Sequence, residues 1–68
     1  MSVIEIRLNG ETRTTNSLSI SQLLTELDLG DRKVAVELNR AIVSRNSYES
    51  TELASGDELE IIHFVGGG

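Results

Sequence analysis

The chain has 68 residues, a formal net charge of -5 at pH 7 and no cysteine. The length predicts a single domain, and the lack of cysteine excludes disulfides and thiolate metal sites. The acidic charge disfavours nucleic acid and anionic lipid surfaces as partners. No apolar run approaches the roughly 20 residues that span a bilayer, and the first residues do not have the pattern of a signal peptide. We therefore expect a soluble cytoplasmic protein.

The chain opens with the pattern of a β-hairpin. Apolar and charged residues alternate over residues 3–8, which is typical of a strand with one buried face. Asn9-Gly10 follows, and both residue types tolerate the positive φ of a two-residue hairpin turn. The threonine-rich segment 11–15 is the predicted return strand.

A helix is predicted over residues 20–29. Ser19 is placed to cap its N-terminus, with Gln22 three residues later to complete a capping box. Apolar residues then recur at helical spacing and form one buried stripe. Gly30 is placed to end the helix in a left-handed conformation.

Three strands are predicted in the second half of the chain. The segment between the second and third of them, residues 44–55, is polar and irregular, and we expect Tyr48 and Leu53 to anchor it in the core. Turns are expected at residues 39–40 and 56–57. The predicted strands are 34–38, 41–43 and 58–65.

The element order is therefore β-β-α-β-β-β, an α+β fold in which the one amphipathic helix covers one face of a mixed sheet. The other face is left to solvent or to partners. Residues whose apolar side chains are expected to meet under the helix form one predicted core: Leu23, Leu24, Leu27, Val36, Leu38, Leu59 and Ile61.

The period of two in the last strand predicts which of its side chains face partners. If Leu59, Ile61 and His63 face the helix, then Ile62 and Phe64 lie on the opposite face. Aromatic residues are enriched in interface cores, so Phe64 and Ile62 are candidate docking residues. His63 has no Cys, Asp or Ser partner nearby in the sequence, which favours a structural role over that of a base. We find no catalytic set and no metal-ligand spacing.

At this point the chain resembles the β-grasp fold of ubiquitin-like proteins, and within that group the ThiS family of sulfur carriers in thiamine thiazole biosynthesis. The family pattern often has Gly after the Asn and Pro before the Arg of the middle segment, whereas this chain has Arg40 and Ser44 there, both in predicted turns. The resemblance extends over the whole chain. The residues that carry it are Val36-Glu37-Leu38-Asn39, Ile42-Val43, Arg45, Gly56-Asp57-Glu58-Leu59-Glu60-Ile61 and His63-Phe64-Val65-Gly66-Gly67-Gly68.

The resemblance implies a carrier that is a substrate of other enzymes and not itself an enzyme. Residues 1–65 would form the β-grasp domain and residues 66–68 a flexible glycine tail, in which Gly68 carries the sulfur and Gly66 and Gly67 give access to narrow active sites. An E1-like enzyme would use ATP to adenylate the Gly68 carboxylate, and a sulfur donor such as a cysteine desulfurase would convert it to a thiocarboxylate for a thiazole synthase. The chain itself would bind no cofactor.

Two other kinds of ubiquitin-like protein stay open as alternatives. One is a sulfur carrier like the small subunit of molybdopterin synthase, which has a related fold and tail. The other is a protein modifier that forms an amide with lysine side chains. The short chain and its similarity to the thiamine carriers favour the first function over both.

Overall fold

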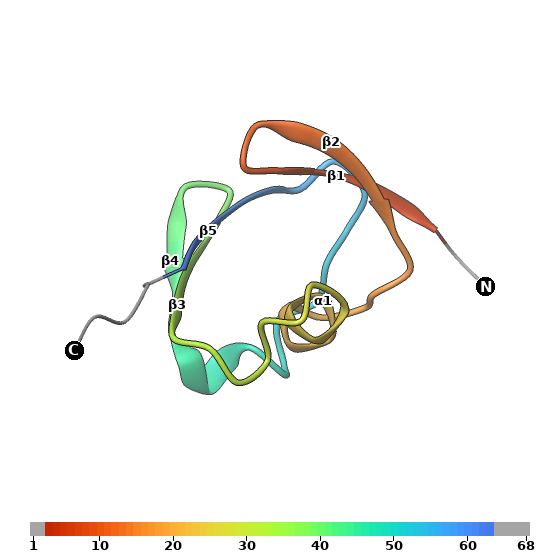
Figure 1. The fold of residues 1–68 in the computed structure, drawn as a ribbon. Helices are drawn as coiled ribbons and strands as arrows, with labels where there is room; N and C mark the ends of the chain where they lie inside the picture. The colour runs from red at the N-terminus through yellow and green to blue at the C-terminus, as the bar shows by residue number, and fades with distance from the viewer. Residues whose placement is uncertain (1–2, 64–68) are drawn as a thin grey trace.

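A five-stranded mixed sheet, crossed on one face by a helix, makes up the computed structural model, which describes residues 3–63 (Figure 1). The elements are β1 (Ile4–Leu8), β2 (Glu11–Thr15), α1 (Ile20–Glu26), β3 (Val34–Leu38), β4 (Ala41–Val43), the short 3-10 helix η1 (Arg45–Ser47) and β5 (Glu58–His63). The strand order is β2-β1-β5-β3-β4. β1 and β5 are parallel, and the other neighbouring strands are antiparallel. This confirms the predicted α+β arrangement with a mixed sheet.

The two antiparallel hairpins turn through left-handed backbone conformations. Asn9 and Gly10 have φ values of 52° and 84°, which fit the predicted two-residue turn between β1 and β2. Asn39 and Arg40 adopt φ values of 51° and 72° between β3 and β4. The second turn thus has the same geometry, although its second position holds a residue with a Cβ.

Replacing Arg40 with glycine is expected to stabilise the fold. The left-handed conformation costs an L-residue about 1–2 kcal/mol, and glycine avoids this cost. Part of the gain is lost because glycine makes the unfolded chain more flexible. We expect Arg40→Gly to raise the free energy of unfolding by about 0.5–1 kcal/mol in urea denaturation. A lower midpoint would show that the Arg40 side chain stabilises the turn more than its backbone strains it.

The N-terminus of α1 forms where the sequence predicts it. The Ser19 side chain accepts a hydrogen bond from the Gln22 backbone N–H at 3.2 Å, as an N-cap residue does. The Gln22 side chain reaches back, but it accepts from the Leu18 N–H at 2.8 Å and not from the N–H of the cap itself. The predicted reciprocal cap is therefore formed with its return bond shifted by one residue.

The C-terminus of α1 differs from the prediction. The helix ends at Glu26 instead of Leu29, and Asp28, with φ 62°, takes the left-handed position predicted for Gly30. The Leu29 N–H donates to the Leu24 carbonyl at 2.7 Å and the Asp28 N–H to that of Thr25 at 3.0 Å. This is the Schellman pattern, which satisfies the last carbonyls of a helix. The early turn also brings Leu29 against the core, which explains why the helix stops before the glycine.

The core lies between α1 and the covered face of the sheet. Five of the seven predicted core residues are buried, but Leu27 and Leu38 are only partly buried and pack at its margin. Leu27 is the C-cap residue of α1, and Leu38 is the last residue of β3, so both lie where their elements end. Tyr48 and Leu53 pack against the core as predicted. The buried apolar residues are Ile6, Ile20, Leu23, Leu24, Val36, Leu59 and Ile61.

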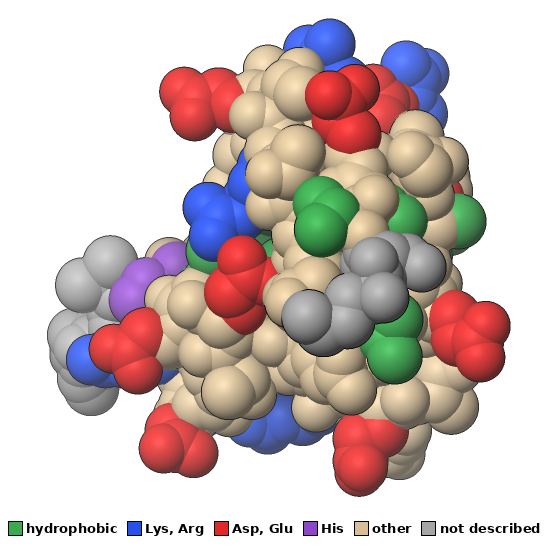
Figure 2. Space-filling model, turned by 90° about the vertical axis from the view of Figure 1, so that its right-hand side faces the viewer, with side chains coloured by type: hydrophobic (Ala, Val, Ile, Leu, Met, Phe, Trp, Pro, Cys, Tyr) green, Lys and Arg blue, Asp and Glu red, His purple; other side chains and the backbone are tan. Residues whose placement is uncertain are grey.

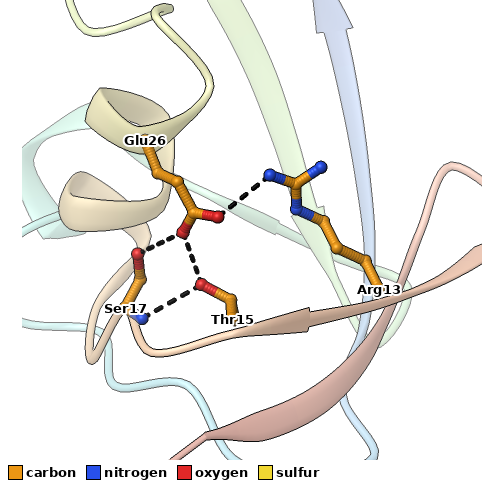
Figure 3. Close-up of polar contacts among 4 residues, drawn as sticks. All are labelled: Arg13, Thr15, Ser17 and Glu26. Carbon is orange, nitrogen blue, oxygen red and sulfur yellow. Dashed lines mark hydrogen bonds and ion pairs between the residues drawn. The ribbon is translucent and has the colours of Figure 1, made fainter.

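A polar cluster fastens α1 to the end of β2 (Figure 3). The Glu26 carboxylate accepts hydrogen bonds from the hydroxyls of Thr15 and Ser17, the latter at 2.8 Å, and pairs with the Arg13 guanidinium at 2.9 Å. Thr15 and Ser17 are themselves buried. The hydrogen bond from Thr15, followed by those from Arg13 and Ser17, lowers the pKa of Glu26 from 4.5 to about 2. The carboxylate is held ionised with its acceptors occupied, so this cluster is a structural brace and a poor proton acceptor.

Replacing Glu26 with glutamine is expected to make stability less dependent on pH. Because folding lowers the pKa of Glu26, its contribution is complete above pH 4.5 and is lost as the pH falls from 4.5 to about 2. The side chain is 31% exposed, so solvent screening reduces the contribution to roughly 1–2 kcal/mol. Urea denaturation should show Glu26→Gln less stable than the wild type at pH 7 and equal to it near pH 2. The exposed Glu49→Gln is the control, and an equal loss at both pH values would contradict the assignment.

Candidate functional site

β5 leads from the centre of the sheet to the C-terminal segment that the sequence predicts to be functional. It lies between β1 and β3 and is described to His63. The predicted site residues Phe64, Gly66, Gly67 and Gly68 lie outside the described residues, as does the predicted end of this strand at residue 65. The described part of this region consists of β5 and its neighbours β1 and β3.

Both hairpin turns hold β5 in place through asparagine side chains. The Asn9 side-chain oxygen accepts from the Ile61 N–H at 2.8 Å, beyond the point where β1 itself pairs with β5. The Asn39 side chain accepts from the Glu58 N–H at 2.9 Å and donates to Asp57 at 3.1 Å. Asparagine in the first position of each turn was visible in the sequence, but not its reach to a strand far along the chain. These hydrogen bonds fix the position of β5, the strand that precedes the C-terminal segment, within the sheet.

The structure confirms the exposure predicted for Ile62, whose side chain is 54% accessible on the face away from α1. Its docking role stays a prediction. Ile42 in β4 is 81% accessible on the same face, and sequence reasoning did not single it out. Its place in a three-residue strand opposite Glu37 shows that it faces solvent, which the apolar run 41–43 did not reveal.

His63 is exposed, although its register matches that of the buried Leu59 and Ile61. The register alone therefore does not bury the ring. Within residues 3–63 its ring forms no hydrogen bond or ion pair that would prepare it as a base. In the same range, no group of three or more His, Asp or Glu side chains is arranged to hold a metal ion.

The charged side chains are spread over the surface. On the face shown in Figure 2, a small group of hydrophobic side chains has both acidic and basic side chains around it. No helix among the described residues is long and apolar enough to cross a membrane. Large apolar side chains are exposed at a few described positions, among them Ile42 and Ile62.

A sheet of this order, with parallel first and last strands at its centre and one helix across it, defines a β-grasp protein of the ubiquitin-like kind. The model of the ThiS family matches residues 6–68 of this chain, so the chain belongs to this family.

Individual relatives agree with the family assignment. The chain is 42% identical over 50 residues to the sulfur carrier protein ThiS of Bacillus subtilis, covering 74% of this chain and 76% of that protein. It is 44% identical over 66 residues to a thiazole synthase of Paramagnetospirillum magneticum, covering 96% of this chain, which spans only 20% of that protein. The crystal structure of a thiamine biosynthesis protein (ThiS) from Geobacter metallireducens has a TM-score of 0.80 and 30% identity, covering 96% of this chain and 100% of that one.

Proposed function

We propose that the chain carries sulfur as a thiocarboxylate on Gly68. The Gly68 carboxylate attacks the α-phosphorus of ATP on an E1-like activating enzyme, which releases pyrophosphate and leaves an acyl-adenylate. The terminal sulfur of a persulfide, formed by a donor such as a cysteine desulfurase, then attacks the acyl carbon and displaces AMP. A thiol reduces the resulting acyl disulfide, which leaves the thiocarboxylate and releases a disulfide. The thiocarboxylate is consumed by a thiazole synthase. The observation that carries this proposal is the ThiS family match, which extends through residue 68.

The chemistry of the three C-terminal glycines fits a carrier that is activated by a separate enzyme. A carboxylate is a poor electrophile until it has a good leaving group, so the activation needs a partner enzyme. Glycine has no Cβ and can pass through a slot too narrow for side chains. Three extended residues reach roughly 10 Å, so Gly66, Gly67 and Gly68 can bring the reacting carbon into a partner while the body stays outside.

A thiazole synthase as the sulfur acceptor is supported by the relatives. Two proteins called thiazole synthase contain a region similar to 96% of this chain, at 44% and 41% identity. A carrier-like region within such proteins is consistent with a carrier and a synthase that act together. We extend this to the chain itself as part of the proposal.

Mass spectrometry tests the proposed chemistry directly. The purified chain is incubated with ATP, the activating enzyme and sulfide, and its intact mass is measured. We expect an increase equal to the exchange of one oxygen for one sulfur, located on the C-terminal residue by fragmentation. Linkage to a lysine of another protein would instead identify a modifier, and sulfur transfer to a molybdopterin precursor but not to a thiazole synthase would identify the other carrier class.

Docking of the activating enzyme is expected to depend on Phe64 and Ile62, beside the tail. Truncating an aromatic hot-spot residue typically costs at least about 2 kcal/mol of binding free energy, so Phe64→Ala should weaken binding roughly thirtyfold in calorimetry, and Ile62→Ala less. Leu18→Ala is a suitable control, because Leu18 is 63% exposed and precedes α1. Unchanged affinity with intact circular dichroism would contradict the docking role.

A further inference from the structure

The chain has very few side chains that can attack an activated carboxyl group. It has no cysteine, and of its six basic side chains all but Lys33 are arginines. A guanidinium stays protonated in proteins and is not a nucleophile, whereas a lysine amine that has lost its proton attacks carbonyl carbons. Under the proposed function Gly68 becomes an acyl-adenylate. Lys33 is therefore the one side-chain amine of the chain that can react with this acyl carbon.

Lys33 lies at the end of the sheet from which the C-terminal segment continues. It directly precedes β3, whose first residue, Val34, pairs with His63, the last residue of β5. Neighbouring strands are about 4.8 Å apart. Because β3 and β5 are antiparallel, the start of β3 lies beside the end of β5. Lys33 is thus far from His63 in the sequence but close to it in space.

The backbone on both sides of Lys33 is held in place, while its side chain is open to solvent. The Arg32 N–H donates to the Leu29 carbonyl at 3.0 Å, and the Tyr48 hydroxyl donates to the Val34 carbonyl at 3.5 Å. Lys33 is exposed. In the part of the chain that the structure describes, its ammonium forms no ion pair. A reacting group can therefore approach it without displacing a charged partner there.

The residues after β5 are long enough to bring Gly68 to Lys33 of the same chain. Five residues follow His63, and five extended residues span roughly 17 Å. The last three are glycines, which adopt positive and negative φ about equally well and so allow a reversal of direction. Groups joined through a short linker meet at an effective concentration in the millimolar range. A second copy of the chain at micromolar concentration competes poorly with this.

We propose that Lys33 accepts the chain's own acyl group when no sulfur is delivered. This inference rests on the proposed function. The Lys33 Nζ, as the free amine, attacks the carbonyl carbon of the Gly68 adenylate. A C–N bond forms, the bond from this carbon to the AMP oxygen breaks, and the proton of the amine passes to water. The product is a chain closed by an amide between Gly68 and Lys33. It has no terminal carboxylate, so it is neither activated again nor able to carry sulfur.

A thioester at Gly68 tests the acceptor without the activating enzyme. The full chain is prepared as an intein fusion and released with a small thiol, which leaves the thioester. Attack by the Lys33 amine expels the thiol and gives a monomer whose mass is one water below that of the free acid. At micromolar chain, we expect this cyclic monomer to form at least about tenfold faster than a linked dimer. Fragmentation should locate the new bond on Lys33.

Two variants keep the charge of the chain and change the place of the amine. Lys33→Arg removes the amine, and its thioester should hydrolyse with at least about tenfold less cyclic product. Lys33→Arg/Arg40→Lys has the composition of the wild type, but its lysine follows Asn39, whose N–H donates to the Glu58 carbonyl at the start of β5. The C-terminal segment would have to run back along roughly 17 Å of strand to reach it. We expect as little cyclic product as for Lys33→Arg.

Three results would overturn this inference. They are a wild-type thioester that only hydrolyses, linked dimers in place of the cyclic monomer, and cyclisation of Lys33→Arg at the wild-type rate. The last result would place the bond at another amine, such as that of Met1.

The activating enzyme links this inference to the proposed function. With ATP and the enzyme but no sulfide, the wild-type chain should become the cyclic monomer and Lys33→Arg should keep its mass. With sulfide, both should form the thiocarboxylate. A wild-type chain that acquires sulfur but never cyclises rejects only the role of Lys33. A chain whose thioester cyclises but which never acquires sulfur rejects the proposed chemistry.

Discussion

Deleting Gly68 is expected to abolish productive sulfur transfer while the protein stays folded. Every buried apolar residue of the described chain lies between Ile6 and Ile61, so the core does not depend on the last glycine. The new terminal carboxylate, on Gly67, would be about 3.3 Å short of its former position. A misplacement of 1 Å can cost on the order of a hundredfold in rate. We therefore expect at least a hundredfold slower thiocarboxylate formation, measured by mass spectrometry at fixed activating enzyme, ATP and sulfide.

Gly67→Val tests the same reach by another route. A β-branched side chain stiffens the backbone and widens it, so a narrow channel should exclude the variant although its length is unchanged. Gly66→Ala is the milder control and should be better tolerated. Normal thiocarboxylate yield and delivery from the chain without Gly68 would show that the last residue is not the sulfur carrier. Loss of the folded circular dichroism signal would instead show that the glycine segment supports the fold.

Leu23→Ala is expected to cause the largest loss of stability among the single substitutions considered. Leu23 is fully buried at the centre of the helical stripe, and such a truncation costs about 2–5 kcal/mol from lost burial and the cavity it leaves. Folded domains are stable by only about 5–15 kcal/mol, and small ones lie toward the lower end. A loss of 2 kcal/mol would lower the melting temperature by at least about 8 °C in a domain of this size. Differential scanning calorimetry measures the change.

Leu27→Ala is the matched control on the same helix. Leu27 is only partly buried at the helix C-cap, so its truncation should cost less, roughly 1–2 kcal/mol. Equal losses at the two positions would mean that the margin of the core is packed as tightly as its centre. A change within error at Leu23 would place the core elsewhere.

Features that depend on a few neighbouring residues could be predicted from the sequence. The turn at Asn9-Gly10 follows from residues that tolerate positive φ, and the start of α1 follows from the Ser19 cap. The alternation in β5 separates the exposed Ile62 from the buried Ile61 without any knowledge of the neighbouring strands. The proposed role of Gly68 likewise depends on the sequence and its family resemblance.

Other features depend on residues that only the folded chain brings together. The left-handed residue after α1 is Asp28 and not Gly30, and this turn packs the partly buried Leu29 against the core, a contact that no local pattern encodes. Ile6 is a core residue because β1 lies beside β5 under the helix. The asparagine that completes the pairing of Ile61 is 52 residues away.

The polar contacts show the same division between local and tertiary causes. Glu26 reads as an ordinary exposed helix residue until β2 places Thr15 and Arg13 against it. Glu37 and Glu60 read as solvent-facing charges until the register of β3 and β5 sets them opposite each other. Local conformational preferences and hydrophobic period therefore determined the elements and their faces. The tertiary structure alone decided which charges meet, because strand register and helix position bring together groups that are distant in the chain.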